Sequence, residues 1–246
     1  MLFFSCIVAF IIVMLLAQAF SKPLAAHSKR VTVITGNQRK VQDASIIFGV
    51  PLSLVGDDVN EIQSTATSVA FKKVRSFFKK FGPCLCEDTS FGIPDTNYID
   101  QQKDAIFPAL VKHLIDACKV GHGKLVDALK AISPNYTVYH YTSTVAFCYN
   151  AKVVLFQCIM IGTIRYGGGK GDIDPYFVPS SYILMRIEDG VSVRKDGLVN
   201  NPDQKTIGEQ PENRSSVHPR QFALREAKSY LDSEGYTING NDIVSS

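Results

Sequence analysis

Residues 31–40 constrain the fold of this chain more than any other stretch of its sequence. Residues 31–34 form a short run rich in β-branched side chains, which predicts a buried strand, and the turn 35–37 leads directly into a helix. Such a junction gathers backbone N–H groups, a hydroxyl, a side-chain amide and the ammonium group of Lys40 near one point. The sequence therefore predicts an α/β protein with a site suited to a polyphosphate.

Further charged residues follow at spacings compatible with the same site. Glu61 precedes Lys73 by twelve residues, and the apolar strand predicted at 83–86 leads into Glu87-Asp88-Thr89. Carboxylates are suited to hold Mg²⁺, and ammonium groups are suited to hold phosphate. Together these are the parts that a nucleoside triphosphate hydrolase needs.

Length and composition favour one substantial domain. The chain has 246 residues, of which 46% are apolar and 20% charged. Its net charge of +3 comes from scattered lysines and arginines, so the sequence gives no case for nucleic-acid binding. We expect the cysteines after residue 19 to be free core thiols, since they are odd in number and lie in apolar patterns: Cys84, Cys86, Cys118, Cys148 and Cys158.

Hydrophobic periodicity predicts the main elements of this domain. Apolar residues at helical spacing predict helices around residues 41–48, 70–81 and 110–118, and a C-terminal helix that begins near Pro219. Runs rich in β-branched and aromatic residues predict strands at 51–55, 136–149 and 152–164, the last two joined by a tight turn. Residues 96–104 read as a loop insertion.

In their order along the chain, these motifs resemble the inosine triphosphate pyrophosphatases, a family that removes non-standard purine nucleotides. The family motif Thr/Ser-Gly-Asn-x-x-Lys is matched by residues 35–40, an Asp-Leu-Pro-Glu segment is similar to 58–61, and a Glu/Asp-Asp-Ser/Thr motif matches 87–89. A helix lysine of the family is similar to Lys112, and its late Asp-Pro-x-Phe matches 174–177. The resemblance covers roughly residues 31–231.

The resemblance implies a fold and an activity. The implied fold is an elongated mixed β-sheet flanked by helices, with two lobes around a nucleotide-binding cleft. It comprises residues 31–235, between an N-terminal segment of residues 1–30 and a tail of residues 236–246. The implied activity is Mg²⁺-dependent hydrolysis of inosine, deoxyinosine and xanthosine triphosphates to the monophosphate and pyrophosphate by a homodimer.

The same resemblance implies roles for individual residues. The family's catalytic positions correspond to Lys40, Lys73 and Asp88, of which Asp88 orients or deprotonates the attacking water, and its metal-binding positions to Glu61, Asp88 and the neighbouring Glu87. The positions that hold the substrate correspond to Thr35, Gly36, Asn37, Lys40, Lys73, Thr89, Lys112, Asp174, Arg214, His218 and Arg220.

The base-recognition half departs from the family pattern. Residues 171–173 are Gly-Asp-Ile, where the family has an aromatic-Gly-aromatic motif whose first ring stacks on the purine. The family's late Lys and Ser-His-Arg correspond poorly to Arg214 and to residues 217–220. Two alternatives follow: a family member with altered base selectivity, and a nucleotide-binding protein with little or no turnover.

Residues 1–19 form an apolar run without charge, followed by Lys22, Lys29 and Arg30. This pattern predicts a targeting or anchoring segment that contacts a membrane or the translocon. Three interpretations remain open: a cleaved secretory signal, an uncleaved anchor with a cytosol-facing domain, and a bipartite leader for a plastid.

Overall fold

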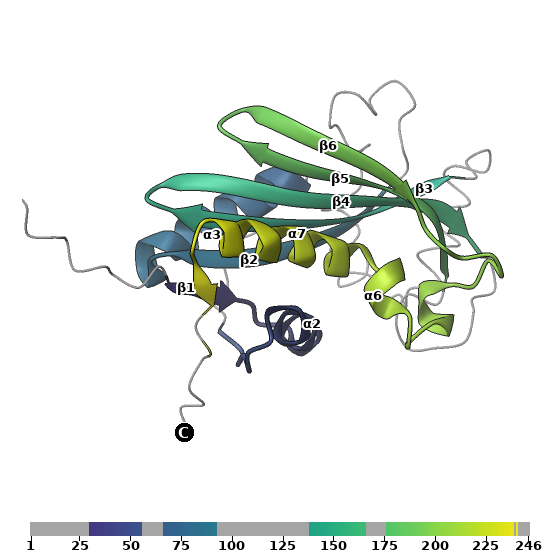
Figure 1. Cartoon of the computed structure of the whole chain (residues 1–246), viewed down its shortest axis with the longest axis horizontal. Coiled ribbons are helices and arrows are strands. Elements are labelled where there is room, and N and C mark those ends of the chain that lie inside the picture. Colours follow the sequence, from purple (N-terminus) through teal and green to yellow (C-terminus); the bar gives the residue numbers. More distant parts are fainter. Residues whose placement is uncertain (1–29, 56–65, 93–137, 166–175, 239, 241–246) are drawn as a thin grey trace, which may run out of the picture.

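The computed structural model describes residues 30–55, 66–92, 138–165, 176–238 and 240. In these residues, seven strands form one sheet in the order β6-β5-β4-β3-β2-β1-β7 (Figure 1). The strands are β1 (Arg30–Ile34), β2 (Cys84–Gly92), β3 (Tyr139–Tyr149), β4 (Lys152–Ile164), β5 (Phe177–Glu188), β6 (Val191–Leu198) and β7 (Thr237–Ile238). The helices are α2 (Gln38–Phe48), α3 (Ala66–Phe81), the 3₁₀-helix η2 (Ile207–Glu209), α6 (Arg214–Val217) and α7 (Pro219–Ser233). The predicted α/β class with a mixed sheet is confirmed.

The pairing of β1 with β2 positions the candidate site. These strands are parallel, with Thr32 opposite Cys84 and Ile34 opposite Cys86. β1 also pairs in parallel with β7, whereas the neighbouring pairs from β2 to β6 are antiparallel. Because parallel strands run in the same direction, the turn that follows β1 lies beside residues 87–89 of β2.

Helices cover both faces of the sheet around β2 and β3. α7 lies on one face, in front of the strands in Figure 1, and α3 lies behind them. One core cluster joins Leu85 and Phe156 to α7 and α2, and a second joins Cys86 and Leu155 to Val74 of α3. β3 is therefore buried along almost its whole length.

Most predicted elements within the described residues are confirmed. β4 and the start of α7 lie where the sequence placed them, and the predicted turn between β3 and β4 has positive φ angles at Asn150 and Ala151. The four described cysteines are free.

Two expectations were wrong. Residues 51–55 contribute a single bridge, between Thr35 and Val55, and residues 87–89 lie inside β2, which continues to Gly92 because it pairs with β3. The hairpin β5–β6 was not predicted.

Other predictions lie outside the described residues. These are the helix at 110–118, the insertion at 96–104 and the apolar segment 1–19. The two lobes around a cleft stay a prediction. Within the described ranges, no helix combines the length and apolar character that a membrane crossing requires.

Gly162 provides a test of the packing between β4 and β5. The register of this pair shifts between Ile161 and Gly162, and a Cβ atom at Gly162 would lie closer than 3.0 Å to the Val178 carbonyl and the Phe177 ring. We therefore expect Gly162→Ala to lower the free energy of unfolding by about 1–3 kcal/mol, measured by urea denaturation. Thr163→Ala, at the exposed neighbouring position, is the control. Equal stabilities of the two variants would contradict this packing.

Candidate active site

The turn between β1 and α2 is shaped by its own polar side chains. Asn37 is the N-cap of α2, and its Oδ1 accepts hydrogen bonds from the backbone N–H groups of Arg39 (2.9 Å) and Lys40 (3.4 Å). The Thr35 hydroxyl accepts a hydrogen bond from the Asn37 N–H at 3.2 Å. Gly36 and Asn37 are exposed. The turn thus presents the positive end of α2 to solvent.

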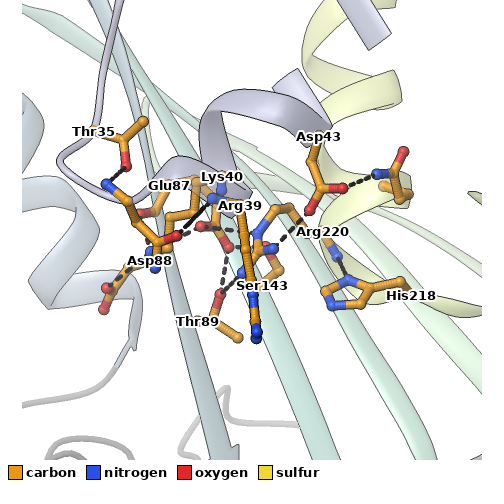
Figure 2. A network of polar contacts seen from close by, with 12 residues as sticks. Thr35, Arg39, Lys40, Asp43, Glu87, Asp88, Thr89, Ser143, His218 and Arg220 are labelled. Atoms are coloured by element: carbon orange, nitrogen blue, oxygen red, sulfur yellow. Dashed lines mark hydrogen bonds and ion pairs between the residues drawn. The ribbon is translucent and has the colours of Figure 1, made fainter. Parts of the chain in front are cut away.

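Glu87 is the buried centre of the polar contacts in Figure 2. Ser143 and Thr89 donate hydrogen bonds from their hydroxyls to Oε1 of Glu87, at 2.6 Å and 2.5 Å. On the other oxygen, Oε2, the ammonium group of Lys40 lies at 2.9 Å and Nε of Arg220 at 3.2 Å. Lys40 also donates to the main-chain carbonyl of Glu87.

The two cations hold Glu87 by charge. Its Oε2 and the Nε of Arg220 are both buried without a hydrogen bond of acceptable geometry, although they are close enough to form an ion pair. Burial by itself would raise the pKa of Glu87. The charges of Arg220 and Lys40 and the hydrogen bonds from Ser143 and Thr89 outweigh that effect and hold the pKa well below its usual range. Glu87 is therefore a permanent anion at neutral pH.

Asp88 points to the other face of the sheet, because successive residues of a strand alternate. Its Oδ1 lies 3.1 Å from the ammonium group of Lys73 on α3 and 4.0 Å from that of Lys40. Burial raises the pKa of Asp88, and the negative charge of Glu87 raises it further. The positive charges of Lys40 and Lys73 lower the pKa, but by less, so the pKa of Asp88 lies above its usual value. The environments of the two adjacent carboxyl groups thus drive their pKa values apart, a pattern typical of sites that carry out proton transfer.

Asp43 forms a second buried centre that the sequence analysis missed. It lies on α2, three residues after Lys40, and its carboxylate contacts Arg214, Arg220 and Gln221. Burial would raise the pKa of Asp43, but the two arginines outweigh it, and the pKa is lowered. The available sequence signal was the spacing of one helical turn from Lys40, which places both residues on the same side of the helix.

Ion pairs connect these groups into what we call the charge chain, in which positive and negative groups alternate. In order, its members are Arg214, Asp43, Arg220, Glu87, Lys40, Asp88 and Lys73. The chain runs from α6 to α3 and crosses the sheet at β2. It holds four cations and three anions, so a single positive charge remains to attract an anionic ligand.

The described residues predicted to read the base lie at the start of α6 and α7. His218 is fully buried as the N-cap of α7; its Nδ1 accepts the N–H of Arg220, and its Nε2 lies 3.4 Å from the Tyr141 hydroxyl. The guanidinium group of Arg220 contacts Asp43, Thr89 and Glu87. The structure brings Arg214, His218 and Arg220 together, and their base-reading role stays a prediction.

Three predicted site residues, Glu61, Lys112 and Asp174, lie outside the described residues. Among the residues that are described, no three His, Cys, Asp or Glu side chains lie close enough to share a metal ion. Asp88 is a partly exposed carboxylate whose lysine contacts fall on Oδ1, so its geometry fits a cation ligand. Glu87 fits less well, since both of its oxygens face protein donors.

Replacing Glu87 should reveal its role through pH. We expect Glu87→Gln to lower the free energy of unfolding near neutral pH by about 3 kcal/mol, because it leaves the buried guanidinium group of Arg220 without one of its two carboxylate partners. Glu87 has a depressed pKa when folded, so its contribution is complete above its ordinary value of 4.5 and is lost as pH falls through the lower folded value.

The difference in stability between wild type and Glu87→Gln should therefore shrink below about pH 4.5, measured by urea denaturation over a pH series. Glu226→Gln, an exposed substitution on α7, is the control. A difference that stays constant down to about pH 3 would show that the Glu87 charge does not stabilise the fold.

Comparison with known proteins places this architecture in a family. The model of the Ham1 family matches residues 31–230. The structure of a HAM1 protein from Coxiella burnetii is similar, with 17% identity, a TM-score of 0.60, and coverage of 83% of this chain and 98% of that chain. The Ham1 protein of Staphylococcus aureus shows 16% identity and a TM-score of 0.54, with coverage of 84% and 100%. At such identities the likeness shows the fold, and the family match spans most of the sequence. This protein is a member of the Ham1 family.

Proposed function

We propose that this protein is a Mg²⁺-dependent pyrophosphatase that hydrolyses non-standard purine nucleoside triphosphates, such as inosine and xanthosine triphosphates, to the monophosphate and pyrophosphate. Family membership supports the reaction class. The observation that carries the proposal is the position of Asp88, a carboxyl with a raised pKa between Lys40 and Lys73, beside the exposed N-terminus of α2.

The proposed reaction is attack of water on the α-phosphorus. Asp88 takes a proton from the water while the water oxygen bonds to the α-phosphorus. The bond from that phosphorus to the bridging oxygen breaks, which releases pyrophosphate. Asp88 suits this role because its carboxylate is partly exposed and lies beside the ammonium groups of Lys40 and Lys73. Negative charge grows on the bridging and phosphoryl oxygens, where Lys40, Lys73 and the N–H groups of α2 stabilise it.

Mg²⁺ would be held by Asp88 together with Glu61, and when bound it would neutralise charge on the phosphates. We assign Glu87 a positioning role in place of its predicted role as a ligand. Its Oε1 accepts hydrogen bonds from Ser143 and Thr89, and its Oε2 faces Lys40 and Arg220. By fixing Lys40, Glu87 holds that ammonium group 4.0 Å from Oδ1 of Asp88.

The proposed base preference is for purines with a 6-oxo group. It rests on the donors of Arg214 and Arg220 near the start of α7, since guanidinium groups suit an oxygen acceptor. The lack of an aromatic ring at residues 171–173 removes a stacking surface worth about 1–3 kcal/mol, so we expect discrimination about one to two orders of magnitude below that of a family member with the ring.

Asp88→Asn and Lys73→Ala should each lower kcat by about 10²–10³-fold while leaving the protein folded, because both groups act on the reacting phosphate. The measurement is pyrophosphate release with Mg²⁺ from inosine, xanthosine, adenosine and guanosine triphosphates, with circular dichroism to check folding. Lys152→Ala is the control, since it removes a lysine of an exposed ion pair at the start of β4.

Rates within a few-fold of wild type in either variant would contradict the assigned roles. A wild-type protein that binds inosine triphosphate but releases no pyrophosphate would favour the alternative of a nucleotide-binding protein without turnover.

A further inference from the structure

A single buried carboxylate, Asp43, joins the first helix of the described chain to its C-terminal helices. Its Oδ1 accepts hydrogen bonds from Arg214 Nε (3.3 Å) and Gln221 Nε2 (2.7 Å). Its Oδ2 accepts from Arg214 Nη2 (3.1 Å) and Arg220 Nη1 (2.7 Å). Asp43 is 5% exposed, and its partners lie 171 to 178 residues along the chain. The carboxylate therefore accepts four hydrogen bonds, and its interaction with Arg214 is bidentate.

Asp43 stands between the two halves of the proposed site. On α2 it lies one turn after Lys40, on the side that would hold the triphosphate. Its partners Arg214 and Arg220 lie in the first turns of α6 and α7, on the side that would meet the base. The carboxylate thus fixes the position of one half relative to the other.

The two arginines depend on Asp43 to different degrees. Arg220 also contacts Glu87 and Thr89, so it keeps partners when the Asp43 charge is removed. Among the described residues, both side-chain hydrogen bonds of Arg214 go to Asp43. The helix α6 that carries Arg214 has four residues, and its N-cap residue makes no side-chain capping bond. The position of Arg214 therefore rests on Asp43 more than that of Arg220 does.

We propose that Asp43 is a positioning residue for nucleotide selection, which holds Arg214 where it meets the base and leaves the triphosphate side unchanged. This inference rests on the proposed function and adds a residue that the sequence motifs did not indicate. Loss of the Asp43 charge would leave two neighbouring cations facing each other, and repulsion would move Arg214, the more exposed of the two, away from its place.

The first test compares substrates. We expect Asp43→Asn to reduce the ratio of kcat/KM for inosine triphosphate to that for adenosine triphosphate by about tenfold, mainly through a higher KM for inosine triphosphate. Asp43→Glu keeps the charge and should restore the ratio to within about threefold. Asp232→Asn, which removes an exposed carboxylate of α7, is the control and should leave the ratio unchanged.

The ratio separates positioning from a merely structural role. A variant that only unfolds in part lowers the amount of active enzyme, which reduces kcat/KM for both nucleotides equally and leaves their ratio unchanged. Arg214→Gln provides a further check. If Asp43 acts through Arg214, adding Asp43→Asn to Arg214→Gln should change the ratio by less than about twofold.

The second test needs no turnover. Calorimetry with Ca²⁺ in place of Mg²⁺ measures binding of inosine triphosphate and of inorganic triphosphate, which has no base. Asp43→Asn should raise Kd for inosine triphosphate about tenfold and change that for inorganic triphosphate by less than about twofold.

Equal weakening of both probes, or an unchanged ratio, would overturn the role of Asp43. A wild type that binds inosine triphosphate selectively but does not hydrolyse it would overturn the proposed turnover, and the calorimetric comparison would still decide the role of Asp43. A wild type that binds neither probe would overturn both proposals.

Discussion

A carboxylate enclosed as fully as that of Glu87 stays ionised only if the protein replaces the water that it has lost. Removing an isolated carboxylate from water costs several kcal/mol even after relaxation. Here β2 and β3 supply hydroxyl donors, α2 supplies Lys40 and α7 supplies Arg220. These elements must meet at one point for the charge to be compensated. The need to compensate one anion therefore fixes how the helices sit on the sheet, and with them the geometry of the candidate site.

Alternation along β2 divides this site between two faces of the sheet. Glu87 turns toward the face covered by α2 and α7, and Asp88 turns toward α3. One carboxyl is fixed as an anion by its neighbours, while burial makes the other a stronger base. Two consecutive residues thus acquire different chemistry because a strand presents them to different surroundings.

Sequence reasoning located the parts of the site that local pattern determines. The turn 35–37 and the helix with Lys73 follow from short-range periodicity. The pairing of β1 with β2 brings the turn to Asp88, and the packing of α3 on the sheet brings Lys73 there. Asp43 was missed because its partners are 171 to 178 residues away, and no local pattern encodes such a pairing. The role of Ser143 depends on the register between β2 and β3, which the sequence did not provide. The missed hairpin β5–β6 did carry a signal, the turn Asp189-Gly190 with positive φ at both residues.

Among the described strands, β6 forms one border of the sheet, and it is exposed along nearly its whole length. Val191, Val193 and Leu198 are 66%, 53% and 85% exposed, so this border offers both apolar side chains and backbone groups to another polypeptide. Its middle residues, Arg194, Lys195 and Asp196, are charged, and Arg194 grips Asp196 with two hydrogen bonds. A strand that paired with β6 would have to remove water from the charged side chains of Arg194, Lys195 and Asp196. Resistance to fibrous aggregation at this border therefore depends on three hydrated side chains, and substituting them with neutral residues would leave a template for cross-β growth.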